Sequence, residues 1–288
     1  NTTVFFGPGI YTDGLKVTKN NVTLSGDNTH FKGAVIEGKA TFVIGGDNVV
    51  IESIECSGVA VRDNNGACVR FEGDNLTLTN VHFHDSQQGL LQSSKNGGSI
   101  FVKYSLFENL GKNGRAHGLY TNGDLLDVSD SQFIGTKDQG HSIKSRSKVT
   151  RLDNVTIDSA KGNDSRSIDI PNGGELYVKN SVIYQGLNTV NGQIVGYALE
   201  SLSRQRTHKI EIINSIIIGE RPNGNRFLLL RKDMENLQLS IYDSVFVGKF
   251  NDQDLISEQG NVLFKDRSEA GIKRSELPKS KDIQALRL

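Results

Sequence analysis

Polar and ionisable side chains recur at a regular interval in the middle of this chain of 288 residues. Three stretches carry them: His117-Gly118-Leu119-Tyr120-Thr121-Asn122, His141-Ser142-Ile143-Lys144-Ser145-Arg146 and Arg166-Ser167-Ile168-Asp169-Ile170-Pro171. Aligned on the apolar residue at the third position, they are offset by 24 and 25 residues. This alignment predicts that Tyr120, Lys144 and Asp169 stack in one column. Asn122 and Arg146 would then stack in the next column.

These side chains are of the kinds needed to move a proton beside a carboxylate. Lys, His or Tyr can act as a base when burial or a neighbouring cation lowers the pKa. An arginine fork binds a carboxylate through two parallel hydrogen bonds. A groove lined by these groups resembles those of polysaccharide lyases and uronate epimerases, whose reactions begin with removal of the C5 proton of a uronic acid. This resemblance implies that both functions are needed, and that a lyase also needs an acid for the departing oxygen.

We assign roles on this basis. Lys144 or His141 is the expected base, Tyr120 is the expected acid, and Asp169 positions Lys144. Arg146 and Asn122 would hold the carboxylate. The candidate catalytic residues are Lys144, His141, Tyr120, His117 and Arg146, and the candidate substrate-binding residues are Asn122, Asp169, Arg166, Arg115, Arg70 and Asn172.

The placement of some candidates depends on local geometry. His117 and His141 share the parity of the buried face, but at a strand start beside glycine they could lean into the same groove. Arg70 extends the column if Cys68-Val69-Arg70-Phe71 and Gly89-Leu90-Leu91-Gln92 stack above it, which is a looser alignment. The alternative is that these outward charges only form a solvated sheet surface with cross-strand pairs.

A repeat must position these residues. Seven equivalent apolar positions can be recognised: Phe83, Phe107, Phe133, Ile157, Ile183, Ile217 and Phe246, spaced by 24, 26, 24, 26, 34 and 29 residues. Each lies in a segment of alternating apolar residues followed by Asn or Asp and often Ser, which indicates a strand with one buried face. No helical period lies between the copies, so βαβ units are excluded. The pattern predicts an all-β fold, a right-handed parallel β-helix of about 8–10 coils.

The β-helix sets the scale of the column. Side chains alternate between the two sides of a strand, so the column is expected to point outward to solvent. Adjacent strands lie about 4.8 Å apart, so three stacked groups span roughly 10 Å, about the reach of a sugar ring and its glycosidic bond.

We expect one β-helix domain over residues 1–288. Residues 1–20 would form an N-terminal cap, 21–265 the coils, and the charged segment 266–288 a C-terminal tail. The insert from Ser201 to His208, with Arg204 and Arg206, lengthens one coil and could rim the groove, or it could be a solvated loop.

Composition narrows the function classes. The chain has 33 basic and 33 acidic side chains and no basic excess, so a nucleic-acid partner is not expected. No window of eighteen apolar residues predicts a transmembrane helix. Calcium often helps to neutralise uronates, and four aspartates lie near the column in the sequence: Asp124, Asp127, Asp130 and Asp138. Their spacing matches no Ca²⁺ loop, so we assign no metal or cofactor.

Two features of the sequence bear on the cellular compartment. The chain begins at Asn1 rather than Met, which fits removal of a secretory signal and equally fits trimming. Cys56 and Cys68 could form one bridge or remain two buried thiols. We expect a secreted or periplasmic protein, and the oligomeric state is left open.

Two sequence stretches resemble known β-helix proteins. Gly7-Pro8-Gly9-Ile10-Tyr11, followed by Asn21-Val22-Thr23-Leu24, resembles the opening rungs of secreted pectate-lyase-like proteins. Ser142-Ile143-Lys144-Ser145 resembles the catalytic-lysine rung of the alginate lyase and chondroitinase B family. That family places an arginine one coil later, whereas this chain has Asp169 there, and Arg166 has the opposite parity. The wider set of motifs is similar to uncharacterised bacterial β-helix-repeat proteins.

The resemblance and the column together indicate an enzyme on an acidic polysaccharide. A β-eliminating lyase is the first hypothesis, and a uronate C5-epimerase using the same residues is the second. A non-catalytic glycan-binding or surface protein is the third. A hydrolase is less favoured, because it needs two carboxylates flanking the bond and the column offers only Asp169.

Overall fold

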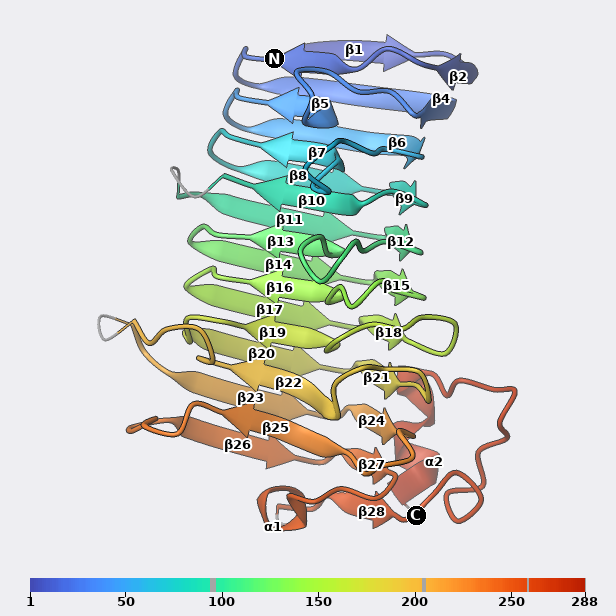
Figure 1. Cartoon of the computed structure of the whole chain (residues 1–288), viewed down its shortest axis with the longest axis vertical. Helices are drawn as coiled ribbons and strands as arrows, with labels where there is room; N and C mark the ends of the chain where they lie inside the picture. Colours follow the sequence, from blue (N-terminus) through green and yellow to red (C-terminus); the bar gives the residue numbers. More distant parts are fainter. Residues whose placement is uncertain (94–96, 204–205, 258, 288) are drawn as a thin grey trace.

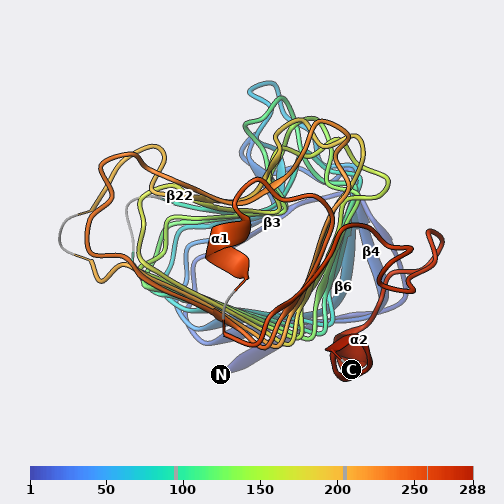
Figure 2. The same ribbon diagram turned by 90° about the horizontal axis from the view of Figure 1, so that it is seen from below.

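The computed structural model describes residues 1–93, 97–203, 206–257 and 259–287. It is a parallel β-helix of about nine turns, as the sequence predicts (Figure 1). Viewed along its long axis, the coils superimpose (Figure 2). Each coil contributes strands to three parallel faces, which we number in chain order within the coil.

Face 1 is a separate nine-stranded sheet. Its strands are β3 (Leu15–Val17), β5 (Ala40–Ile44), β7 (Ala67–Phe71), β10 (Gln88–Gln92), β13 (Leu119–Thr121), β16 (Ile143–Ser145), β19 (Ile168–Ile170), β22 (Gln193–Tyr197) and β25 (Arg226–Leu230).

Faces 2 and 3 belong to one larger sheet, because β4 (Val22–Lys32) and β6 (Val49–Ser57) run through both. Face 2 also has β1 (Thr2–Phe6), β8 (Leu76–Thr79), β11 (Ser99–Lys103), β14 (Leu125–Ser129), β17 (Val149–Asp153), β20 (Glu175–Lys179), β23 (Lys209–Ile213) and β26 (Gln238–Tyr242). Face 3 also has β2 (Gly9–Tyr11), β9 (His82–His84), β12 (Leu106–Glu108), β15 (Gln132–Ile134), β18 (Thr156–Asp158), β21 (Val182–Gln185), β24 (Ile216–Gly219), β27 (Val245–Val247) and β28 (Val262–Phe264).

The predicted apolar ladder is the core of face 3. The strand registers place Phe83, Phe107, Phe133, Ile157, Ile183, Ile217 and Phe246 in successive pairs. All seven are 0–1% exposed. The rings of Phe107 and Phe133 stack with their centroids 4.9 Å apart. Burial of this continuous stack stabilises the packing of coil on coil, at about 25 cal/mol per Å² of apolar surface.

The Asn-or-Asp and Ser pattern forms the corner between faces 2 and 3. Asn180 and Asp130 adopt left-handed backbone conformations, with φ of 49° and 48°, which these residue types tolerate better than most. The serine that follows is buried and satisfies the corner's main chain. Ser131 Oγ donates to Ser129 O at 2.7 Å and accepts from the N–H of Ser105 in the preceding coil at 3.1 Å.

Strand pairing runs from the first residues of the chain to β28. Strand β1 is already in register with β4, with Thr2 opposite Val22. The short helix α1 (Gln253–Ile256) lies over the C-terminal end of the solenoid, with Ile256 buried (Figure 2). The tail, which includes η1 (Ser280–Asp282) and α2 (Ile283–Arg287), packs on the outer side of face 3, where Ile283 joins a cluster with Ile218 and Val247.

The two cysteines are bonded to each other. The Cys56–Cys68 disulfide links β6 to β7 across a separation of 12 residues. Of the two alternatives that the sequence leaves open, the bridge is the one found. No helix in the described ranges is both long enough and apolar enough to span a membrane.

Candidate functional site

The predicted column is present on face 1. Tyr120 is the Cα partner of Lys144, and Lys144 is the partner of Asp169. The expectation that this column faces solvent is wrong for its lower two members, because Lys144 is only 9% exposed and Asp169 only 3% exposed. Neighbouring side chains and the segment after β22 cover them, so outward parity does not mean exposure here.

The carboxylate of Asp169 is surrounded by nitrogen donors. Lys144 Nζ lies 3.4 Å and His141 Nε2 lies 3.6 Å from Asp169 Oδ2, and an Arg166 terminal nitrogen lies 3.6 Å from Oδ1. Arg166 reaches the column despite its opposite parity. A buried carboxylate is tolerated only with such partners. Asp169 can therefore hold the lysine in place.

A glycine makes room for this arrangement. Gly196 is the Cα partner of Asp169 in the next coil. A Cβ atom there would lie 2.7 Å from Asp169 Oδ1 and 2.8 Å from Arg166 Cδ. Sequence reasoning missed Gly196, although it stands one period below Asp169 and carries no side chain in an otherwise polar column.

Two stacked histidines line the inner side of the column. The rings of His117 and His141 are buried, with centroids 4.9 Å apart, and His117 meets the Tyr120 ring edge-on at 5.4 Å. His117 Nδ1 accepts from the N–H of His141 at 3.0 Å, and His141 Nδ1 accepts from the N–H of Arg166 at 3.2 Å. In each neutral ring the proton is therefore on Nε2.

Burial sets the charge state of these histidines. It lowers the pKa of His141 to about 4 and holds the pKa of His117 well below its ordinary value. Both rings are neutral near pH 7. Because the His141 lone pair accepts a main-chain N–H and its Nε2–H faces Asp169, His141 is arranged as a donor to Asp169.

The guanidinium of Arg146 lies beside the column. Its Nε donates to Tyr120 Oη at 2.8 Å, and one terminal nitrogen donates to Asn172 Oδ1 at 2.5 Å. The other terminal nitrogen binds Glu200. Burial alone would lower the pKa of Arg146, but the hydrogen bonds with Glu200 and Tyr120 outweigh it and raise the pKa. Arg146 is thus a fixed cation.

Glu200 bridges the two cations of the site. Lys144 Nζ donates to Glu200 Oε1 at 2.6 Å, while Arg146 binds Oε2. Burial would raise the pKa of Glu200, but the hydrogen bonds from Lys144 and Arg146 outweigh it and lower the pKa. Sequence reasoning missed Glu200, because it precedes the insert and has no counterpart in the neighbouring coils.

The insert after β22 is anchored against the turns that follow β16 and β19. The N–H of Glu200 donates to Pro171 O at 3.1 Å, and Arg206 donates to Arg146 O at 2.9 Å. His208 bonds within the insert, to Ser203 O at 3.0 Å. The insert is therefore anchored by Arg206 and His208, which are half-buried, while Ser201 and Thr207 are exposed to solvent; Arg204 lies outside the described residues.

Of the remaining predicted substrate-binding residues, Asn172 contacts the column, whereas Arg70 and Arg115 do not. Asn172 joins it through Arg146, and the main-chain N–H of Asn122 donates to Gln92 Oε1 at 2.8 Å. Arg70 pairs with Glu72 at 3.2 Å. Leu91 separates Arg70 from Tyr120 in the register, and Arg115 is exposed in a turn. Within the described ranges, no hydrogen bond or ion pair joins Arg70 or Arg115 to the column.

The aspartates near this site are engaged by side chains of the chain itself. Asp124 pairs with Lys148 at 2.6 Å and Asp138 with Lys112 at 3.0 Å. Asp130 accepts from Asn154 at 2.7 Å. They lie in one coil but in different segments of it, since Asp124 and Asp130 flank β14 and Asp138 follows β15, and within the described residues they form no ligand cluster.

Comparison with known proteins gives similarities in solved structures only. No family model and no curated protein matches the chain. A pectin methylesterase, solved in complex with a hexasaccharide, is 13% identical with a TM-score of 0.48, over 96% of this chain and 90% of that one. An alginate lyase of family PL6 is 9% identical with a TM-score of 0.36, over 96% of this chain and 50% of that one. This chain thus spans about half the length of that lyase.

Proposed function

We propose that this protein is a lyase on an acidic polysaccharide, with the face 1 column as its active site. The observation that carries the proposal is the bridged carboxylate of Glu200. Lys144 and Arg146 already bind one carboxylate of the chain's own. A uronate carboxylate can take the place of Glu200 on Arg146 when the segment after β22 moves, and this movement also releases Lys144 from Glu200.

Arg146 is already oriented to bind a carboxylate before substrate arrives. Tyr120 and Asn172 each accept a hydrogen bond from Arg146 and fix the plane of its guanidinium. A planar donor held in advance loses little entropy when it binds a carboxylate bidentately. Neutralising that carboxylate makes the neighbouring C5 proton more acidic.

Elimination then needs a base and an acid. Arg146 holds the uronate carboxylate, and Lys144, after giving one proton to solvent, takes the C5 proton; the electron pair forms the C4=C5 double bond and the C4–O bond breaks. Tyr120 Oη accepts from Arg146, so its own O–H is directed elsewhere and can protonate the departing oxygen. His141 does not serve as the base here, because its lone pair is occupied. It supports Asp169, which orients Lys144.

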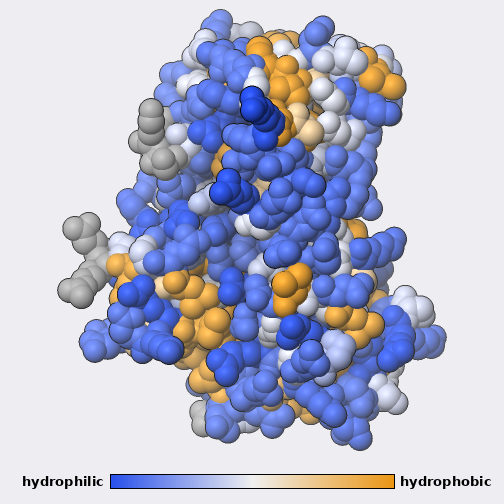
Figure 3. Space-filling view, in the orientation of Figure 1, coloured by the Kyte–Doolittle hydropathy of each residue, from blue (hydrophilic) through white to orange (hydrophobic). Residues whose placement is uncertain are grey.

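The mostly hydrophilic surface in Figure 3 suits a sugar polymer as a partner. The disulfide suits an oxidising compartment, so we further propose secretion or a periplasmic location. An epimerase would use the same groups but return a proton to C5 from the other side.

A panel of uronate-containing polysaccharides tests the proposal. The purified chain is incubated with each polymer while the ultraviolet absorbance of the unsaturated uronate is followed. We expect a rise with at least one polymer that is lost in Lys144→Ala and kept in Lys148→Ala, whose lysine pairs with Asp124 outside the column. Binding across the panel without any product would contradict the lyase.

A further inference from the structure

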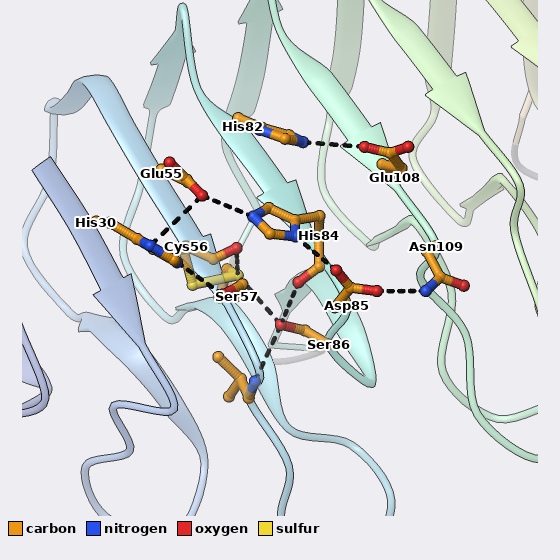
Figure 4. Close-up of polar contacts among 12 residues, drawn as sticks. His30, Glu55, Cys56, Ser57, His82, His84, Asp85, Ser86, Glu108 and Asn109 are labelled. Atoms are coloured by element: carbon orange, nitrogen blue, oxygen red, sulfur yellow. Dashed lines mark hydrogen bonds and ion pairs between the residues drawn. A yellow bond between two sulfur atoms is a disulfide. The ribbon is translucent and has the colours of Figure 1, made fainter. Parts of the chain in front are cut away.

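A second cluster of ionisable side chains lies on the outer side of face 3, in the first coils. His30, Glu55 and His82 follow one another in register, and two residues further along Ser57, His84 and Glu108 do the same. Their neighbours Phe31, Cys56 and Phe83 are buried in the core. Side-chain alternation therefore directs the whole cluster outward, as Figure 4 shows.

Three of these residues converge on one point. His84 Nε2 lies 2.9 Å and His30 Nδ1 lies 3.5 Å from Glu55 Oε1. The potential ligand atoms of His30, Glu55 and His84 all lie within 4.8 Å of one another. We propose that these three residues form a binding site for a divalent transition metal of the zinc class.

Each histidine is held by its other ring nitrogen. His84 Nδ1 lies 2.8 Å from Asp85 Oδ2, and Asn109 in turn donates to Asp85 (Figure 4). His30 Nε2 lies 2.7 Å from Ser57 Oγ. Metal-binding histidines are usually oriented in this way by a carboxylate or another polar partner. Both rings thus present their remaining nitrogen to the same oxygen of Glu55, Oε1.

The donor set selects the class of metal. Two imidazoles and one carboxylate suit Zn²⁺ and similar transition metals, whereas Ca²⁺ and Mg²⁺ prefer oxygen ligands alone. The only cysteines, Cys56 and Cys68, form a disulfide and offer no thiolate. Three protein ligands leave one position of a tetrahedral metal for water or another ligand.

The site is both rigid and accessible. Its ligands come from β4, β6 and β9 in consecutive coils, so a metal would clamp those coils together. A surface hollow of about 520 Å³, lined by Glu55, His84 and Lys161 among others, opens beside it. His82 stacks on His84 at 4.3 Å, but its Nε2 faces Glu108 at 3.3 Å. His82 is therefore outside the proposed ligand set.

Titration calorimetry of the chelator-treated full chain, without a histidine tag, with Zn²⁺ tests this site. We expect one saturable site and a melting temperature raised by Zn²⁺. His84→Ala and the nearly isosteric Glu55→Gln should each weaken binding at least tenfold, while the matched His82→Ala retains it. Circular dichroism confirms that each variant is folded.

Three results would overturn the proposal. They are an absence of saturable Zn²⁺ binding, equal binding by wild type and Glu55→Gln, and equally tight binding of Ca²⁺ at the same residues.

Discussion

Lys144 Nζ donates a hydrogen bond of 2.6 Å to Glu200 Oε1, across 56 residues of sequence. The same carboxylate binds Arg146, so a glutamate just before the insert occupies both the proposed base and the arginine best suited to a substrate carboxylate. In this arrangement the chain itself competes with its proposed substrate.

Removing the charge of Glu200 should strengthen substrate binding. In Glu200→Gln the neutral side chain binds Lys144 and Arg146 less tightly and competes less with substrate. We therefore expect KM for the responsive polyuronate to fall roughly 3- to 10-fold, with little change in kcat. The matched control is Glu211→Gln on face 2, where the glutamate pairs with Lys209 at 2.9 Å. A higher KM in Glu200→Gln would mean that Glu200 helps to bind substrate.

Gly196→Ala should disturb the column directly. Its Cβ would fall 2.7 Å from Asp169 Oδ1, so Asp169 and Arg166 must shift. We expect a loss of activity of at least tenfold and a destabilisation of about 1–3 kcal/mol. Gly7→Ala is the control, because a Cβ at Gly7 meets nothing within 4 Å. Activity and denaturant unfolding are measured for both, and unchanged activity in Gly196→Ala would argue against a role for Asp169.

The sequence predicted the core and the register of the column, because both follow one period. Phe107 and Phe133 stack, and so do Tyr120 and Lys144, since the coil length is nearly constant there. Glu200 could not be found in this way, because the insert lengthens its coil and only tertiary contacts bring it to Lys144. The prediction that Lys144 faces solvent is wrong for the same reason, because Glu200 covers it.

The histidines of face 3 could have been found by extending the ladder backwards. Cys56 and Phe31 continue the ladder above Phe83, which places His30 and Glu55 on the outer side. The irregular register between Ser25 and Thr29 hides this relation in the sequence. No periodic signal indicates that Asp85 then orients His84.

A buried carboxyl outside the site should make stability depend on pH. Asp164 accepts hydrogen bonds from Ser159 at 2.6 Å and Thr189 at 2.7 Å, and burial raises its pKa to about 6 from 3.8. The folded chain therefore binds this proton more tightly than the unfolded chain does. The contribution of this group to the free energy of unfolding is therefore lost as the pH rises from about 4 to 6. The total lost once the pH is above 6 is about 3 kcal/mol at most.

Asp164→Asn removes that titration. We expect the variant to unfold at a higher temperature than wild type at pH 7.5 and at nearly the same temperature at pH 4. Thermal unfolding followed by circular dichroism at both values measures the difference. A variant equally destabilised at both pH values would show that the hydrogen bonds of the carboxyl outweigh its burial.

The disulfide should stabilise the first coils. Cys56 and Cys68 close a short loop of the chain, for which the loss of unfolded-state entropy predicts about 3 kcal/mol. We expect the double variant Cys56→Ser, Cys68→Ser to melt at a lower temperature than wild type, and reductant to lower the melting temperature of wild type alone. An identical response of both proteins to reductant would contradict this.

The central claim is that the face 1 column removes the C5 proton of a uronate and breaks the chain by elimination. Proton magnetic resonance of the reaction in D₂O, with the polymer that responds in the panel, tests it most directly. We predict the vinylic H4 signal of an unsaturated end in the wild type and its absence in folded Lys144→Ala. Intact polymer with deuterium at an inverted C5, or the same vinylic signal from Lys144→Ala, would contradict the account.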